Sequence, residues 1–172
     1  VAVDIASEFR DMCPIIPKGT VLITITQSGE TADTLAAQRE AKKKGARTLT
    51  ICNVVGSTTT READSVLYTR AGLEIGVVST KTFTAQLAAL SLLGIALGTK
   101  KGKLSDLEIQ TLKLFLLDLP RLMRQALETD DVVRNIAKTL AGADGILYVG
   151  RGINYPVALE GALKMKELAY LH

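Results

Sequence analysis

Val21-Leu22-Ile23-Thr24-Ile25-Thr26-Gln27-Ser28-Gly29-Glu30-Thr31-Ala32-Asp33-Thr34 is the stretch from which the rest of the chain is best interpreted. Its first six residues are apolar or β-branched and together have the length of a strand. A short turn of hydroxyls, an amide and a glycine follows, and a helical pattern begins at Thr31. Hydroxyls, free backbone N–H groups and the positive end of a helix dipole therefore converge. This arrangement predicts a site for a phosphate or another small anion.

The alternative to an anion site is a capping box, in which Ser28 caps the helix and Thr31 lies three residues further on. This segment alone supports the two interpretations equally. The turn is not a P-loop, because no Gly-Lys-Ser/Thr follows Gly29, and it is not the dinucleotide-binding fingerprint.

Strand and helix patterns alternate on both sides of this stretch. The patterns predict a brief strand over 1–5, a helical turn over 7–10, a strand over 21–26, a helix over 31–44, a strand over 48–54, a helical turn over 61–64, a strand over 65–69 and a buried helix over about 80–97. The alternation is typical of a parallel sheet with helices on both faces, in which ligands bind at the carboxyl ends of the strands. Residues 26–31 and 76–81 are therefore expected to lie at the same edge of the sheet.

The character of the sequence changes after residue 102. Residues 103–141 are predicted to be helical, with Ser105 as a cap and Pro120 either kinking the helix or starting another. Residues 146–149 have the pattern of a buried strand, a glycine turn follows, and a helix begins near Tyr155 with Pro156 in its first turn. This second strand–turn–helix unit resembles the start of another α/β domain.

Three charged residues, Glu160, Lys164 and Glu167, share one face of this last helix. An ordinary charged helix surface is the simpler interpretation, by about two to one. The functional alternative is that a carboxylate held among small, closely packed residues acts as a general base.

Composition excludes several classes of function. The chain has 172 residues, of which 47% are apolar and 23% charged, as in soluble globular domains. Its net charge is +3 and 4% of its residues are aromatic, and no basic stripe is interleaved with aromatics, so we expect no nucleic-acid binding. Two cysteines and one histidine, without a Cys-x-x-Cys pair, argue against a metal site and for a reducing, cytoplasmic compartment. Residues 83–97 fall short of a membrane span.

Four segments, taken in order, resemble the isomerase half of the glucosamine-6-phosphate synthases, which are glutamine–fructose-6-phosphate amidotransferases. They are residues 26–35, 51–54, 74–87 and 150–167. That half consists of two sugar isomerase (SIS) domains, each a three-layer α/β/α structure with a parallel sheet. The first segment alone indicates only an SIS domain that binds a sugar phosphate, whereas the combination is more specific.

The resemblance implies an internal fragment of such an enzyme. Residues 1–102 correspond to a first SIS domain without its opening βα unit, 103–141 to a helical connection, and 142–172 to the first βα unit of a second SIS domain. The implied reaction converts fructose 6-phosphate and glutamine-derived ammonia to glucosamine 6-phosphate without a cofactor, in a homodimer whose glutaminase domain lies outside this chain. The alternative is an SIS domain that binds a phosphosugar without catalysis.

The resemblance also assigns roles to individual residues. The phosphate of the sugar is expected at Thr26, Gln27, Ser28 and Thr31, the sugar hydroxyls at Val77 (through its carbonyl) and Ser79, and the chemistry at Glu167 and Lys164. Glu167 matches the carboxylate that moves a proton between C1 and C2, and Lys164 a lysine close to it. Thr26 departs from the family, which more often has serine there.

The implied truncation leads to a structural hypothesis. The first sheet would lack one βα unit, and the chain ends in a homologous unit over 145–171. We therefore expect this unit to dock on the first sheet, within the chain or by exchange with a second copy, because an open strand edge and an apolar face would otherwise meet water.

Overall fold

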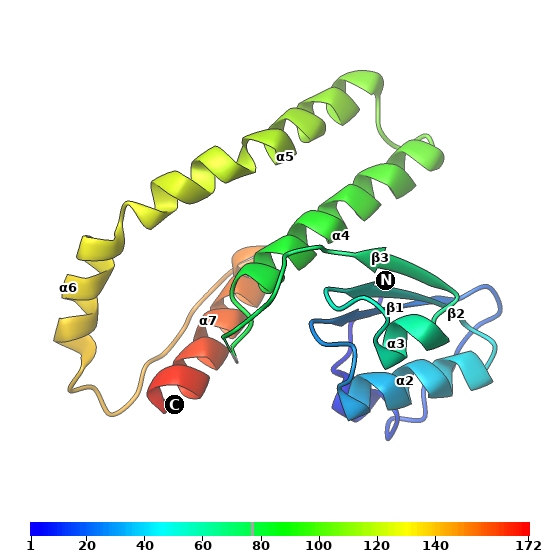
Figure 1. Ribbon diagram of the computed structural model, residues 1–172, viewed down its shortest axis with the longest axis horizontal. Helices are drawn as coiled ribbons and strands as arrows, with labels where there is room; N and C mark the ends of the chain where they lie inside the picture. Colours follow the sequence, from blue (N-terminus) through cyan, green and yellow to red (C-terminus); the bar gives the residue numbers. More distant parts are fainter. Residues whose placement is uncertain (77) are drawn as a thin grey trace. The chain divides into compact units, whose positions relative to one another are not determined.

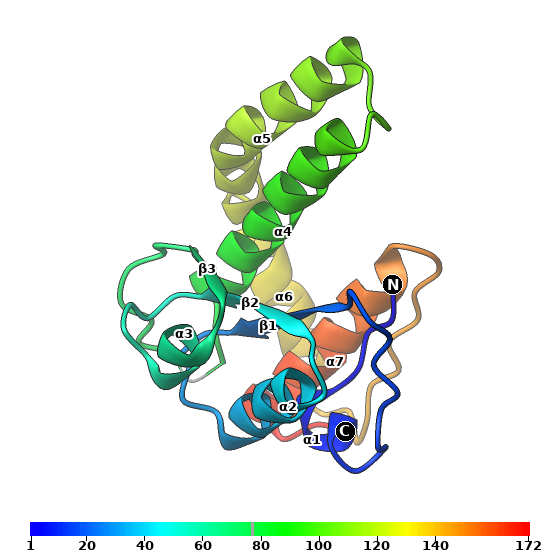
Figure 2. The same cartoon turned by 90° about the vertical axis from the view of Figure 1, so that its right-hand side faces the viewer.

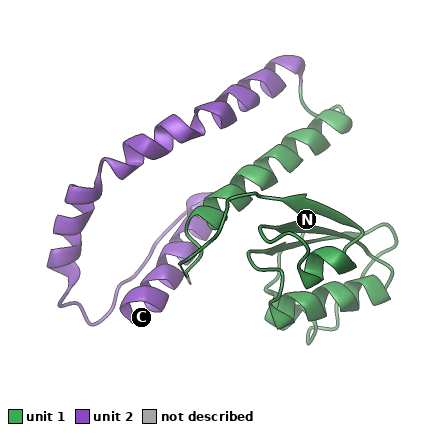
Figure 3. Ribbon diagram, viewed as in Figure 1, with its two compact units in different colours: residues 1–104 green, residues 105–172 purple. Residues whose placement is uncertain are grey.

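The computed structural model describes residues 1–76 and 78–172, which form two compact units, residues 1–104 and 105–172 (Figure 3). The first unit contains α1 (Ala6–Phe9), β1 (Val21–Thr26), α2 (Ala32–Lys43), β2 (Arg47–Cys52), α3 (Thr58–Glu62), β3 (Ser65–Tyr68) and α4 (Lys81–Lys100). The second contains α5 (Asp106–Leu127), α6 (Asp130–Leu140) and α7 (Asn154–Ala169).

The three strands form one sheet in the order β1-β2-β3, and both pairs of neighbours are parallel (Figure 1). Thr26 lies opposite Cys52, and Cys52 lies opposite Tyr68, so the three strands end side by side. The predicted α/β architecture with a parallel sheet is confirmed. The loops that follow β1 and β3, residues 26–31 and 69–80, consequently leave from the same edge of the sheet, as the sequence predicts.

Helices lie on both sides of this sheet, with α2 and α3 on one face and α4 on the other (Figures 1 and 2). The α2 face is held partly by a buried polar network centred on Gln38, whose side chain is fully buried. Its Oε1 accepts hydrogen bonds from the hydroxyls of Thr24 (3.0 Å) and Thr50 (2.8 Å), and its Nε2 donates to the Thr59 carbonyl (2.9 Å). Because every polar group of the Gln38 amide has a partner, the network fixes α2 against β1, β2 and α3.

The prediction that residues 80–97 form a buried helix is right about the helix and wrong about its burial. Only Thr82 and Ala89 of α4 are buried, and Leu87, Leu92 and Leu97 are each about half exposed. Within its unit α4 contacts β2, which is too little surface to cover a helix that is apolar nearly all round. By its length and apolar composition alone, α4 is also long and apolar enough to cross a membrane. Core helices of soluble proteins meet the same two criteria.

In the second unit, the predicted helical character of 103–141 is confirmed by α5 and α6. The Ser105 hydroxyl accepts from the Glu108 N–H (3.3 Å), while the Glu108 carboxylate accepts from the Ser105 N–H (2.8 Å). Ser105 therefore starts α5 with a complete capping box. The helix continues through Pro120 to Leu127.

The predicted strand over residues 146–149 is wrong, and so is the brief strand over 1–5. The Ile146 N–H donates to the His172 carbonyl (3.1 Å), and the Tyr148 ring packs against Gly161, where a Cβ would lie 2.9 Å from the ring. The segment thus lies along α7 instead of in a sheet. A segment forms a strand only beside another strand that donates and accepts its backbone hydrogen bonds. An apolar composition alone does not provide that neighbouring strand.

Residues 146–149 do not add a strand to the first sheet within the chain, so this part of the docking hypothesis is wrong. Among the described residues the sheet consists of β1, β2 and β3. Exchange with a second copy, and the assignment of residues 1–102, 103–141 and 142–172 to parts of two SIS domains, stay predictions.

Candidate functional site

The 26–31 loop is folded by hydrogen bonds in which its hydroxyls accept. The Thr26 hydroxyl accepts from the Gly29 N–H (3.1 Å), and the Ser28 hydroxyl accepts from the Glu30 N–H (3.2 Å). A hydroxyl that accepts from a backbone N–H still has its own hydrogen to donate. Each hydroxyl therefore keeps one hydrogen to donate, and of the two residues Ser28 is partly exposed whereas Thr26 is buried.

The beginning of α2 adds to these donors. Thr31 is the residue immediately before the helix, with ψ 120°, and its side chain makes no capping hydrogen bond. The alternative of a capping box with Ser28 as cap is therefore wrong. The first N–H groups of a helix lack partners within the helix and lie at the positive end of its dipole. Hydroxyl donors and helix N–H groups together suit an anion.

The start of α3 contacts the 26–31 loop and is hydrogen-bonded to it. Gly29 has φ +69°, and a Cβ at this position would lie 2.0 Å from the Ser57 Oγ. The Gly29 carbonyl accepts from the Thr59 N–H (3.0 Å), and the Glu30 carboxylate accepts from the Thr58 N–H (2.8 Å). Hydrogen bonds from Thr58 lower the pKa of Glu30 and hold its charge against α3. The contacts between α3 and the 26–31 loop were not predicted from the sequence. The hydroxyl-rich run over 57–60 was the sequence feature that could have indicated them.

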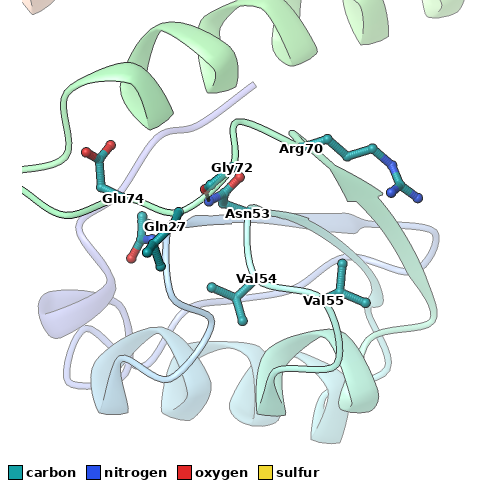
Figure 4. Close-up of a pocket in the computed structure, with 8 residues that line it drawn as sticks. Gln27, Asn53, Val54, Val55, Arg70, Gly72 and Glu74 are labelled. Atoms are coloured by element: carbon teal, nitrogen blue, oxygen red, sulfur yellow. Dashed lines mark hydrogen bonds between the residues drawn. The ribbon is translucent and has the colours of Figure 1, made fainter.

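A pocket of about 320 Å³ joins the two loops (Figure 4). It is lined by Gln27, Asn53, Val54, Val55, Arg70, Gly72, Leu73 and Glu74. Gln27 belongs to the first loop and Glu74 to the second, so both loops border one pocket. Of the predicted site residues that the structure describes, Gln27 lines this pocket, whereas Thr26, Ser28, Thr31 and Ser79 are not among its lining residues. The volume lies at the lower end of the range for small-molecule sites, about 300–1,000 Å³.

Asn53, which sequence reasoning did not single out, shapes this pocket from the end of β2. Its side-chain oxygen accepts from the Thr69 hydroxyl (3.0 Å) and the Ala71 N–H (2.8 Å), and its amide nitrogen donates to the Gly72 carbonyl (2.7 Å). One side chain thereby fixes three successive parts of the 69–80 loop. The asparagine in the Ile51–Val54 segment was the signal.

The second half of the 69–80 loop is organised by Glu74, whose carboxylate turns toward the start of α4 (Figure 4). It accepts from the Thr80 hydroxyl (3.1 Å), the Thr82 N–H (3.1 Å) and the Thr82 hydroxyl (2.8 Å). The hydrogen bonds from Thr82 lower the pKa of Glu74. The Ser79 hydroxyl lies 2.7 Å from the Thr82 hydroxyl. Val77, the other expected contact to the sugar, lies outside the described residues.

The charged residues of α7 lie on one face, as their spacing predicts. The Lys164 Nζ is 2.7 Å from the Glu167 carboxylate and 3.4 Å from the Glu160 carboxylate. Burial lowers the pKa of Lys164, but the hydrogen bond to Glu167 and the two negative charges raise it, and the net shift is upward. Lys164 therefore stays charged at neutral pH. These residues belong to the second compact unit, whereas both loops belong to the first.

No group of three or more His, Cys, Asp or Glu residues that could hold a metal ion occurs in the part of the chain that the structure describes.

Comparison with known proteins adds independent observations. The SIS domain family matches residues 1–96. Proteins named glutamine–fructose-6-phosphate aminotransferase [isomerizing] are 51% identical in Clostridium tetani and 52% identical in Chlorobaculum tepidum, each over all 172 residues. The chain spans 28% of the length of either relative.

A solved structure gives the same result. The C-terminal domain of glucosamine-fructose-6-phosphate aminotransferase from Francisella tularensis superposes with a TM-score of 0.96 at 40% identity, over 99% of this chain and 49% of that chain. The parallel sheet, the loops at its carboxyl edge and the match over residues 1–96 lead to one conclusion: the chain belongs to the SIS domain family.

Proposed function

We propose that this chain provides sugar-phosphate-binding and isomerising residues of a glutamine–fructose-6-phosphate aminotransferase (isomerizing). The proposed reaction converts fructose 6-phosphate and ammonia from glutamine to glucosamine 6-phosphate. The names of relatives that are about half identical over the whole chain support this assignment. Because the chain spans about a quarter of those relatives, the complete activity also needs residues that lie outside it.

The observation that carries the proposal is the direction of the hydrogen bonds in the 26–31 loop. Thr26 and Ser28 accept from backbone N–H groups, which leaves their own hydrogens to donate. A phosphate at neutral pH mainly needs donors. We assign the phosphate to these two hydroxyls, the Gln27 side chain, Thr31 and the N-terminus of α2.

The sugar extends from the phosphate toward the 69–80 loop in this proposal. Gln27 and Glu74 border the same pocket, so a ligand held at the first loop can reach the second. Ser79 and the carbonyl of Val77 are the proposed contacts to sugar hydroxyls.

The isomerisation step is assigned to Glu167. Once ammonia has replaced the C2 carbonyl oxygen, one base can take a proton from C1 and return a proton to C2. The Lys164 Nζ, 2.7 Å from the Glu167 carboxylate, holds that carboxylate in place on α7. The alternative, a phosphosugar-binding SIS domain without catalysis, needs the 26–31 loop alone, and the Glu160–Lys164–Glu167 cluster favours the enzyme.

Three further parts of the proposal concern the larger protein. Ammonia comes from a glutaminase domain, the functional unit is a homodimer, and the enzyme acts in the cytoplasm. All three are implied by the resemblance to the amidotransferases.

Isothermal titration calorimetry of the chain with fructose 6-phosphate, glucosamine 6-phosphate and inorganic phosphate tests the assignment. We expect Ser28→Ala to weaken binding of all three by about tenfold or more, because a hydrogen bond to a charged group contributes about 1.5–3 kcal/mol. Ser7→Ala, at an exposed serine in α1, is the control and should leave affinity unchanged. Absence of sugar-phosphate binding by the wild-type chain would contradict the proposal.

A further inference from the structure

A chain of hydrogen bonds connects Ser79 to a carboxylate through a buried threonine. The Ser79 hydroxyl lies 2.7 Å from the Thr82 hydroxyl, which donates to the Glu74 carboxylate at 2.8 Å. Thr82 is fully buried, so water does not compete for its hydroxyl.

The direction of each bond in this chain follows from the number of hydrogens. An ionised carboxylate only accepts, and Glu74 is ionised at neutral pH because hydrogen bonds from Thr82 lower its pKa. The single hydroxyl hydrogen of Thr82 therefore points to Glu74. In the contact between Thr82 and Ser79, the remaining donor is the Ser79 hydroxyl. Ser79 thus uses its own hydrogen inside the protein, and its oxygen can only accept from a ligand.

We propose that Glu74 and Thr82 are positioning residues that fix the Ser79 hydroxyl as a hydrogen-bond acceptor, so that this end of the site selects a sugar hydroxyl over a group that only accepts. The inference rests on the proposed function, because it specifies the substrate chemistry at the same site. A sugar hydroxyl donates to the Ser79 oxygen, whereas a phosphate or carboxylate oxygen would meet a second acceptor without a hydrogen between them.

The backbone around Ser79 fits a role in orientation. Ser79 has φ +59°, a left-handed conformation that is unfavourable for a residue other than glycine. Glu74 accepts from the Thr82 N–H and from the Thr80 hydroxyl, and thereby holds the residues that directly follow Ser79. The same carboxylate therefore holds the backbone and sets the direction of the hydroxyl.

The first test is the affinity of the Thr82→Val chain for fructose 6-phosphate and for inorganic phosphate. Valine keeps the shape of threonine without its hydroxyl, so Ser79 is free to turn its hydrogen toward the ligand. We expect fructose 6-phosphate to bind about 3- to 10-fold more weakly, while inorganic phosphate changes less than about twofold. Thr82→Ser retains the hydroxyl and should restore binding, which loss of packing alone would not predict.

Glu74→Gln gives a second variant at a partly exposed position, in case Thr82→Val does not fold. The neutral amide accepts more weakly, and its NH₂ group can donate to the Thr82 oxygen in competition with Ser79. We expect the same selective loss of fructose 6-phosphate affinity. An equal loss of both ligands, or unchanged affinity for fructose 6-phosphate, would overturn the proposal.

A titration of the Glu74 carboxyl carbon by NMR distinguishes failure of this proposal from failure of the proposed function. In the wild-type and Thr82→Ser chains the pKa should lie below the ordinary glutamate value, and in Thr82→Val it should rise toward that value. If Thr82→Val leaves the pKa unchanged, the hydrogen-bond chain is refuted whatever the ligand. If the pKa behaves as expected but the wild-type chain binds no fructose 6-phosphate, the chain of bonds stands and the proposed sugar is wrong.

Discussion

The 26–31 and 69–80 loops have similar origins and opposite hydrogen-bonding character. Both follow a parallel strand at one edge of the sheet, both carry serine and threonine, and both lead into a helix. In the first loop, backbone N–H groups donate to the hydroxyls of Thr26 and Ser28. In the second, the hydroxyls of Thr80 and Thr82 donate to the Glu74 carboxylate. The first loop is left with hydrogens to donate, and Ser79 in the second is left with an oxygen that accepts.

The difference shows that the type of side chain does not determine what a hydroxyl recognises. What a hydroxyl recognises is determined by whether its partner within the protein donates a hydrogen bond to it or accepts one from it. Fructose 6-phosphate has an acceptor-rich phosphate at one end and hydroxyl donors along its carbon chain. The two loops together offer the complementary pattern to the proposed substrate.

The largest effect is expected for Gly29→Ala, which should disrupt the first loop and leave the second in place. A Cβ would overlap Ser57 Oγ at 2.0 Å, and the left-handed backbone adds strain. We expect a loss of about 2–4 kcal/mol in the free energy of unfolding, measured with urea, and at least tenfold weaker binding of both fructose 6-phosphate and inorganic phosphate.

Gly56→Ala is the matched control for this change. Gly56 has φ +73°, close to that of Gly29, but a Cβ there would have no neighbour within 4 Å. It should therefore lose only the conformational part, about 1–2 kcal/mol, with little effect on binding. Equal losses in the two variants would show that contact with Ser57 does not hold the first loop.

The sequence was sufficient for the local parts of this comparison. The apolar run over Val21–Thr26 and the glycine after it predicted the strand, its end and the hydroxyl-bearing turn, because strand pattern and turn chemistry are short-range properties. Parallel pairing followed from the alternation of elements. The direction of the hydrogen bonds in the second loop could not be predicted, since it depends on Glu74 and Thr82 meeting in space.

A smaller and selective effect is expected for Asn53→Ala, which should loosen the second loop alone. The change removes hydrogen bonds to Thr69, Ala71 and Gly72, at a cost of about 1–3 kcal/mol in unfolding free energy for three partly exposed bonds. Calorimetry should show several-fold weaker binding of fructose 6-phosphate and unchanged binding of inorganic phosphate. Asn53→Asp keeps the two acceptor bonds and should have a milder effect. Loss of phosphate affinity in Asn53→Ala would mean that the two loops do not act separately.

Two predictions failed where the outcome depended on distant partners. Residues 146–149 have the composition of a buried strand, yet they lie along α7, with Leu147 and Val149 almost fully exposed. The apolar circumference of α4 suggested burial, yet of its apolar residues Ala89 alone is buried in the described unit and the others are partly or largely exposed. An apolar composition indicates that a segment needs to be covered by another element, but it does not specify which element covers it. The candidate site was more predictable because its first loop is contiguous in sequence.

The smallest effect is expected for Thr59→Val, beneath the first loop. Among the buried side-chain oxygen and nitrogen atoms that the structure describes, the Thr59 hydroxyl has no hydrogen-bond partner. Burying an unpartnered hydroxyl is unfavourable, so valine should raise the free energy of unfolding by up to about 1 kcal/mol. Thr60→Val is the control, because the Thr60 hydroxyl donates to the Ser57 carbonyl (2.8 Å), and its loss should destabilise by about 1 kcal/mol.

Affinity for phosphate should be unchanged in Thr59→Val, since the Thr59 backbone N–H, which valine retains, makes the bond to Gly29. Weaker phosphate binding would instead show that the Thr59 hydroxyl donates to the ligand, and the first loop would then draw a donor from α3 as well as from its own residues.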